Sequence, residues 1–283
     1  AERSDEQARY PHPRVERPGA HRTGGLTMMG ADPEVIVEVS ADTLAQRTAG
    51  RSVRTLVAAL SERPVAHLVI TGGGILEQVM RALRDAKDRD DIDWSRVHVW
   101  WGDERFVPSG SEDRNDLAAD RALLDALSLN PAHVHRMPAS DGSYGKDVDA
   151  AAAAYAAELA AVAEPGADVP AFDVVLLGLG PDGHCASLFP HHPSLQHQHT
   201  SVIGVRDSPK PPPTRISLTF NTLGAASEIW FIASGTAKSH AVAMALSGAD
   251  RTDVPSAGPR GQQRTLWLID REAETELAQM SGN

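Results

Sequence analysis

The chain has 283 residues, a hydrophobic fraction of 41%, a charged fraction of 23% and a net charge of -11 at pH 7. This composition is that of a globular protein with one α/β domain or two small ones. The acidic balance argues against nucleic acid or an anionic membrane as the main partner, because both attract basic surfaces. The single cysteine, Cys185, excludes an intramolecular disulfide and favours a cytoplasmic location.

Residues 1 to 30 are polar, are rich in Pro, Arg and Gly, and lack the apolar core of a signal peptide. We expect them to form a disordered arm, with residues 31 to 283 forming a single α/β domain. Met28 and Met29 stand just before the first strand-like run, where the natural start is expected. A binding arm is the alternative for the upstream residues.

Segments typical of strands and of helices alternate from about residue 35 onward, which is the βαβ rhythm of a parallel sheet. The first half predicts strands at Val35 to Val39, Leu68 to Thr71 and Val97 to Trp101, and helices at about Asp42 to Glu62, Leu76 to Ala86, Leu117 to Leu127 and Val148 to Ala163. The second half predicts strands at Asp173 to Leu177, Val202 to Val205, Arg215 to Thr219, Ile229 to Ala233 and Leu266 to Asp270, and a helix at Lys238 to Leu246.

Two turns that follow predicted strands have the composition of anion sites. Thr71-Gly72-Gly73-Gly74 precedes a helix, and the amides of Gly73 and Gly74 at its N-terminus favour a phosphate. A structural tight turn is the alternative. In the turn after Trp101, Arg105 has the chemistry to clamp a phosphate and Asp103 to orient a sugar hydroxyl, with Asn115 in the loop beyond. A surface salt bridge is the alternative there.

The apolar run Asp173 to Leu177 indicates a strand covered on both faces, and it leads into a glycine turn that ends at His184. His184 beside Asp182 is predicted to be a general base, because a neutral imidazole titrates near the working pH. A satisfied structural histidine is the alternative. A helix is expected to begin just after this turn, and Cys185 is expected to be a small buried residue.

The same turn matches the dinucleotide fingerprint G-x-G-x-x-G, and Asp207 lies about where a ribose-binding acid is expected. An NAD-dependent oxidoreductase is therefore an alternative. Against it, Pro190 and Pro193 end any helix after barely one turn, and the crossover helix of that site needs more.

Lysine is scarce in this chain, since only four of the 27 basic residues are lysines. Lys238 follows a glycine turn at a predicted helix start, where its charge is tolerable if an anion lies between it and the helix dipole. A surface lysine is the alternative. Lys210 falls in the run Ser208 to Pro213, which predicts a rigid extended loop or linker. Four histidines, His191, His192, His197 and His199, raise the alternative of a metal, but a solvated loop is expected because no ligand spacing accompanies them.

Taken in order, the blocks TGGG, WGDERFVP, LGLGPDGHCASLFP, RISLT and SGTAK resemble those of the 6-phosphogluconolactonases, from about Val35 to Asp270. The resemblance implies a Rossmann-like, mostly parallel sheet flanked by helices, of the sugar-phosphate isomerase and deaminase type. It implies hydrolysis of 6-phospho-D-glucono-1,5-lactone to 6-phospho-D-gluconate in the pentose phosphate pathway. One departure is that Thr71 and Gly74 replace both serines of the family's S-G-G-S turn, so a hydroxyl bond to phosphate is lost at Gly74.

The resemblance also implies roles for the predicted site residues. His184 activates water with Asp182 orienting it, without a metal or other cofactor, and the implied partner is a small sugar phosphate. We expect a monomer, with an oligomer left open. The alternatives are a glucosamine-6-phosphate deaminase-like enzyme, whose turn continues toward I-A-F-N-E-P, or a non-catalytic sugar-phosphate binding protein. The implied substrate-binding residues are Gly73, Gly74, Asp103, Arg105, Asn115, Arg215 and Lys238, with Arg215 assigned to the phosphate or the oxyanion.

Overall fold

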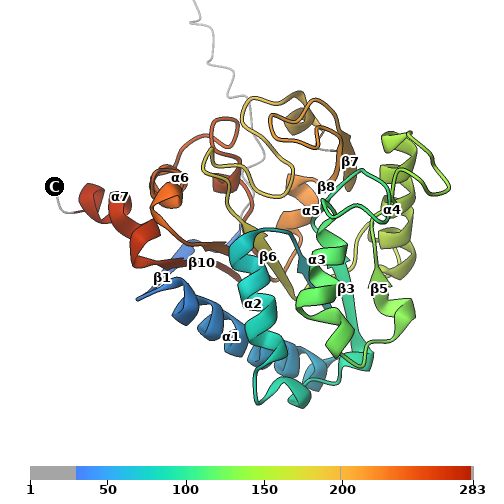
Figure 1. The fold of residues 1–283 in the computed structure, drawn as a ribbon, viewed down its shortest axis with the longest axis horizontal. Coiled ribbons are helices and arrows are strands. Elements are labelled where there is room, and N and C mark those ends of the chain that lie inside the picture. The colour runs from blue at the N-terminus through green and yellow to red at the C-terminus, as the bar shows by residue number, and fades with distance from the viewer. Residues whose placement is uncertain (1–29, 198, 282–283) are drawn as a thin grey trace, which may run out of the picture.

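The computed structural model describes residues 30–197 and 199–281. These residues form a seven-stranded parallel sheet flanked by helices and a separate three-stranded antiparallel sheet (Figure 1). The mostly parallel α/β fold predicted from the sequence is confirmed. The arm predicted for residues 1 to 30 lies outside the described residues, apart from Gly30.

The main sheet places strands from both halves of the chain side by side, and every pairing in it is parallel. Strands at all the ranges predicted for this sheet are present, with ends that differ by one or two residues. The order across the sheet is β1 (Pro33–Glu38), β10 (Arg264–Asp270), β9 (Glu228–Ala233), β6 (Val174–Gly178), β2 (Ala66–Ile70), β3 (Val97–Trp101) and β5 (Val134–His135).

Helices connect these strands, and α1 packs along α2 on the lower side of the sheet in Figure 1. Side-chain caps begin several of them, as where the Asp147 carboxylate accepts the amides of Asp149 and Ala150. No helix of the described residues is long and apolar enough to cross a bilayer. The helices are α1 (Ala41–Glu62), α2 (Gly74–Arg84), α3 (Asn115–Ala122), α4 (Val148–Val162), α5 (Phe220–Gly224), α6 (Ser239–Leu246) and α7 (Arg271–Ser281), with short 3-10 helices at Arg89–Asp91, Trp94–Arg96, Leu124–Ala126, Pro131–His133, Pro193–Gln196, Thr236–Lys238 and Pro255–Ala257.

Two of the predicted strands leave the main sheet. β7 (Val202–Val205) and β8 (Arg215–Leu218) pair antiparallel, and β8 also pairs with β4 (Asp103–Arg105), a strand that the sequence did not predict. Three residues are too few for a recognisable alternation, so β4 has no signal of its own. Its pairing with β8 sets Arg105 opposite Arg215 and joins two segments that are far apart in sequence.

The helix expected after the glycine turn is absent, and that expectation was wrong. The chain turns instead, because the Gly180 amide donates to the His184 carbonyl and Ala186 has a positive φ of 47°. The next helical segment is the single 3-10 turn Pro193–Gln196. The His184 carbonyl, which would accept the first hydrogen bond of a helix starting there, already accepts the Gly180 amide.

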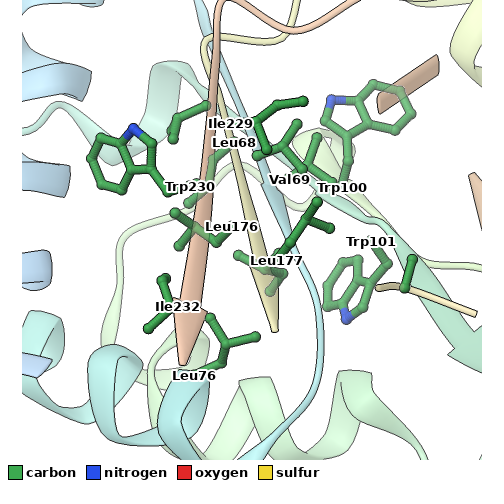
Figure 2. Packing of buried hydrophobic residues seen from close by; sticks show 14 of the residues in the cluster. Leu68, Val69, Leu76, Trp100, Trp101, Leu176, Leu177, Ile229, Trp230 and Ile232 are labelled. Carbon is green, nitrogen blue, oxygen red and sulfur yellow. The ribbon is translucent and has the colours of Figure 1, made fainter. Parts of the chain in front are cut away.

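The core fills both faces of the central strands (Figure 2). Every residue of β2 and β3 is buried, as is expected for parallel strands covered on both sides. Leu176 of β6 pairs with Trp230 of β9, and the rings of Trp230 and Trp100 lie on opposite sides of the strands in Figure 2. The continuous apolar runs in the sequence therefore correspond to strands with no solvent-facing side.

Connections from the two central strands run in opposite directions. From β2 the chain passes through α2 to β3 on one side, whereas β9, a later strand, pairs with β6 on the other. The loops that follow β2 and β6 therefore diverge. In open α/β sheets such a switch point leaves a crevice at the carboxyl ends of the strands, and ligands bind there.

At the opposite, amino end of the sheet, four imidazoles gather in the interior. His67 and His98 are paired residues of β2 and β3, and the His98 Nδ1 lies 2.8 Å from the His135 Nε2. The ring of His133 stacks on His98 with centroids 3.8 Å apart. Burial first, and then the charge of the neighbouring imidazoles, lowers the pKa of His67 to about 4 and that of His98 to about 3.

These lowered pKa values predict a fold that loses stability in mild acid. Between about pH 6.5 and pH 4 the unfolded chain binds protons that His67 and His98 in the folded chain do not, so the free energy of unfolding falls as the pH falls. The loss is at most about 1.4 kcal/mol per pH unit for each histidine. Urea unfolding across this range measures it. His98→Asn should flatten the dependence and His240→Asn, on the surface of α6, should not; equal slopes in both variants would contradict the assignment.

Candidate active site

A cavity of about 410 Å³ lies at the carboxyl ends of β2, β3, β6 and β9, at the switch point of the sheet. It is lined by turns that follow all four strands and by the loop that precedes β8. The predicted site residues meet there although they come from distant parts of the sequence, and Asp182 touches His184 beside the cavity. Those that line it are Gly73, Gly74, Asp103, Arg105, Asn115, His184, Arg215 and Lys238.

The imidazole of His184 is held by Asp182, with 2.5 Å between Nδ1 and Oδ1. Burial raises the pKa of Asp182, but the hydrogen bond from His184 and the charges of His184 and Lys210 outweigh it and hold that pKa well below its usual range. The carboxylate is therefore ionised and acts as the acceptor. This assigns the proton to Nδ1 and leaves the lone pair on Nε2, the state that a general base needs.

The glycines of this turn give the imidazole its space. A Cβ at Gly180 would lie 2.0 Å from the His184 Nδ1 and 2.3 Å from the Asp182 Oδ1. Gly183 has a φ of 83°, and its carbonyl accepts the amide of Ser256. The central glycine of the G-x-G-x-x-G pattern is thus explained by close packing against the histidine, and Gly183 by its positive φ and by Val254, which a Cβ there would approach to 2.7 Å.

A buried carboxylate that the sequence did not single out organises the charged turn. Glu104 is fully buried and accepts the amides of Arg105, Asn115 and Asp116 at 2.7, 2.7 and 2.9 Å. Burial raises its pKa to about 7, against the opposing effects of Arg114 and the amides. These bonds tie the start of α3 to β4, so that Arg105 and Asn115 face the same cavity.

Two cations of the cavity lack anionic partners among the described residues. The Arg105 Nη1 donates to the Asp113 carbonyl at 2.6 Å, but its Nε is buried without a hydrogen bond. The side chain of Lys238 makes no hydrogen bond or ion pair to the described part of the chain, whereas its backbone amide donates to the Gly235 carbonyl at 3.0 Å. Burial, and then the charge of Lys210, lowers the pKa of Lys238. Positive charge without a counterion in a cavity is the arrangement expected for an anionic ligand.

The glycine turn after β2 contributes open backbone. A Cβ built at Gly73 or Gly74 would meet nothing within 4 Å, so the first turn of α2 is uncovered, and the amides of such a turn have no acceptor within the helix. The Thr71 hydroxyl is used elsewhere, since it donates to the Leu176 carbonyl at 3.0 Å and accepts the Gly178 amide at 3.3 Å. This bond ties β2 to β6 at the edge of the cavity.

Asp103 is buried and already holds a partner. Its Oδ2 accepts the Ser187 hydroxyl at 2.7 Å, and its carbonyl accepts the Asn115 Nδ2 at 3.1 Å. Both bonds join the charged turn to neighbouring loops, and Ser187 was not predicted to take part. Small polar residues of this kind carry no sequence signal until the fold shows what they face.

Lys210 is the main residue that the sequence reasoning missed. It lies in the proline run predicted to be a rigid extended loop or linker, to which the sequence reasoning gave no role in the site, and its Nζ lies 3.3 Å from both the Asp182 Oδ1 and the His184 Nδ1. The scarcity of lysine was the only signal that pointed to it. The histidine-rich loop stays apart from this site, and among the described residues no three His, Cys, Asp or Glu side chains are grouped for a metal. Cys185 is buried as predicted, and burial raises the pKa of its thiol.

The family model described as glucosamine-6-phosphate isomerases/6-phosphogluconolactonase matches residues 39–267. The chain belongs to this family. A 6-phosphogluconolactonase of Streptomyces coelicolor is 51% identical over 251 residues, which are 88% of this chain and 96% of that one. Another from Mycobacterium tuberculosis is 47% identical over 236 residues, or 83% and 95% of the two chains. The resemblance inferred from the motifs is confirmed.

Solved structures of the family share this architecture. The 6-phosphogluconolactonase of Trypanosoma brucei superposes with a TM-score of 0.72 at 26% identity, covering 87% of this chain and 99% of its own. A monomeric glucosamine-6-phosphate deaminase superposes with a TM-score of 0.70 at 20% identity, over 86% and 99% of the two chains. At this level of identity, the similarity to the deaminase structure shows only that the two proteins share a fold.

Replacement of Gly180 by alanine tests the packing around the imidazole. The new Cβ is expected to push His184 off Asp182 and to cost about 1–3 kcal/mol of stability, as overpacking does. Nitrogen NMR of the imidazole detects the loss of the Nδ1 hydrogen bond, and thermal unfolding measures the change in stability. Gly110→Ala, where a Cβ meets nothing within 4 Å, is the control. An unaltered imidazole resonance in Gly180→Ala would refute the packing argument.

Proposed function

We propose that this chain hydrolyses 6-phospho-D-glucono-1,5-lactone to 6-phospho-D-gluconate, the second step of the oxidative pentose phosphate pathway, with His184 as the general base. Lactone hydrolysis is the activity named by relatives that are 51% and 47% identical over most of their length. The observation that carries the mechanism is the His184–Asp182 pair at the wall of a cavity that also holds Arg105 and Lys238, two cations without an anionic partner among the residues that the structure describes.

A lactone carbonyl is already electrophilic, so the reaction needs a positioned water, a base and stabilisation of the oxyanion. The His184 Nε2 takes a proton from water as the water oxygen bonds to C1. The tetrahedral intermediate then collapses, the bond from C1 to the ring oxygen breaks, and the imidazolium returns the proton to that oxygen. Asp182 keeps the Nδ1 proton in place and stabilises the transient imidazolium, as the carboxylate of a catalytic triad does.

The other residues of the cavity bind the substrate in this proposal. Lys238 and Arg105 supply positive charge for the phosphate, and the amides of Gly73 and Gly74 supply donors from the first turn of α2. Asp103 and Asn115 face the sugar hydroxyls. Arg215, which lines the cavity, was assigned from the sequence to the phosphate or the oxyanion. No step requires a metal ion or another cofactor.

Kinetics of two variants separate the base from the phosphate site. His184→Ala should lower kcat by at least about a hundredfold with little change in KM, because it removes proton transfer. Lys238→Ala should mainly raise KM, because it removes binding to a group that does not react. Rates are corrected for spontaneous hydrolysis of the lactone. Wild-type turnover in His184→Ala would rule out the base assignment.

Substrate choice and metal independence are tested together. A coupled assay on freshly generated 6-phosphogluconolactone, run beside glucosamine 6-phosphate and with a chelator, should show lactone hydrolysis that chelation does not change. Release of ammonia from glucosamine 6-phosphate would favour the deaminase alternative. Binding of both sugar phosphates without turnover would favour a sensor.

The proposal also includes one domain over residues 31 to 283, a monomer, and a cytoplasmic location. A single cooperative unfolding transition supports one domain. Light scattering at several protein concentrations tests the monomer, and a mass that grows with concentration would contradict it. Cell fractionation tests the location.

A further inference from the structure

Arg215 points its guanidinium at a neighbouring loop. Its Nε donates to the Pro212 carbonyl at 2.9 Å, and its Nη2 donates to the carbonyls of Lys210 and Pro211 at 3.1 and 3.3 Å. The side chain is buried, with its guanidinium 5.8 Å from the centre of the Phe189 ring. Two of its three nitrogens are thus committed to the chain itself, which leaves less of this group for a substrate.

The segment that Arg215 holds is a closed loop. The Ser208 amide donates to the Pro213 carbonyl at 3.0 Å, and the Ser208 hydroxyl donates to the Lys210 carbonyl at 2.8 Å. Prolines have no amide hydrogen, so the carbonyls are the only hydrogen-bonding groups that the three prolines offer. Arg215 binds two of these carbonyls and so fixes the loop relative to β8.

This loop delivers the Lys210 ammonium to the base. The Lys210 Nζ lies 3.3 Å from the Asp182 Oδ1 and 3.3 Å from the His184 Nδ1. Because Nδ1 carries a proton that it donates to Asp182, it cannot accept from Lys210, and the lysine hydrogen bond goes to the carboxylate. The contact with Nδ1 is then one of charge and not a hydrogen bond.

We propose that Lys210 and Arg215 are positioning residues for the lactonase reaction, with Lys210 holding the Asp182–His184 pair in its reactive state and Arg215 holding Lys210 in place. This inference rests on the proposed function. Lys210 gives the Asp182 Oδ1 a further donor besides the imidazole and the amide of His184, and this donor keeps the carboxylate ionised and fixed on Nδ1–H. The charged groups that face Lys210 are Asp182 and His184 of the turn, Lys238 of the next strand end, and Arg215 of β8.

Kinetic constants test the role of Lys210. Lys210→Met should lower kcat near neutral pH by about tenfold, with KM changed by less than about threefold, because it removes a donor that fixes Asp182 on the imidazole. Lys210→Arg should restore much of the rate, because it restores the charge. Lys146→Met, at an exposed position, should behave as the wild type. An unchanged kcat with a raised KM would overturn the proposal in favour of a phosphate ligand.

A double-mutant cycle tests whether Arg215 acts through Lys210. Arg215→Lys keeps the charge but cannot make the same bonds to the loop carbonyls, so it should lower kcat as Lys210→Met does. If Arg215 acts only by placing Lys210, the kcat of the double variant should lie within about twofold of that of Lys210→Met alone. If the decreases in kcat caused by the two substitutions multiply in the double variant, or if Arg215→Lys changes KM alone, Arg215 contacts the substrate.

Two measurements keep this inference separable from the proposed function and from misfolding. Thermal unfolding identifies any variant that has lost its fold. Nitrogen NMR of His184 reads the Nδ1 hydrogen bond without any substrate, and Lys210→Met should shift that resonance. A wild type inactive on the lactone with a shifted imidazole in Lys210→Met would overturn the function and keep the positioning role. If the wild type hydrolyses the lactone and the imidazole resonance is unshifted in Lys210→Met, the positioning role is overturned and the proposed function is kept.

Discussion

The site depends on one constraint, which is that the carboxyl ends of β2 and β6 lie side by side while the chain leaves them in opposite directions. The Thr71 hydroxyl bridges the two strands at this point, and both turns beyond them are built from glycine. Without side chains at Gly72 and Gly180, the turns approach Asn115 and His184 closely. The crevice therefore exists because the loops that follow β2 and β6 diverge. It keeps its shape because no side chain larger than that of glycine fits at Gly72 or Gly180.

Charge in the crevice is arranged by two carboxylates, one buried at Glu104 and one partly exposed at Asp182. Glu104 gathers three amides and so fixes the turn that carries Arg105. Asp182 is itself held between His184 and Lys210. An acidic chain with a net charge of -11 thus presents cations where an anionic substrate would bind. Both carboxylates are bound to donors, and among the described residues no carboxylate pairs with the cations of Arg105 and Lys238.

The antiparallel sheet adds the part of the site that a plain parallel sheet would lack. Pairing of β4 with β8 places Arg215 next to the charged turn, and Arg215 in turn holds the proline loop with Lys210. The sequence predicted the strand of Arg215 and gave that residue a substrate role. The structure shows its guanidinium bonded to loop carbonyls instead, which motivates the positioning role proposed for it.

By itself, the sequence determined the parallel α/β fold, the turns that carry the site, and the membership of the lactonase and deaminase family. These are local properties, since buried strands are continuous apolar runs and glycine turns are short motifs. Only the tertiary structure decided that β4, β7 and β8 form their own sheet, that no helix follows His184, and that Lys210 reaches it. Lys210 lies 26 positions from His184, and the paired residues of β4 and β8 are more than 100 positions apart. No local pattern encodes which distant segments will meet.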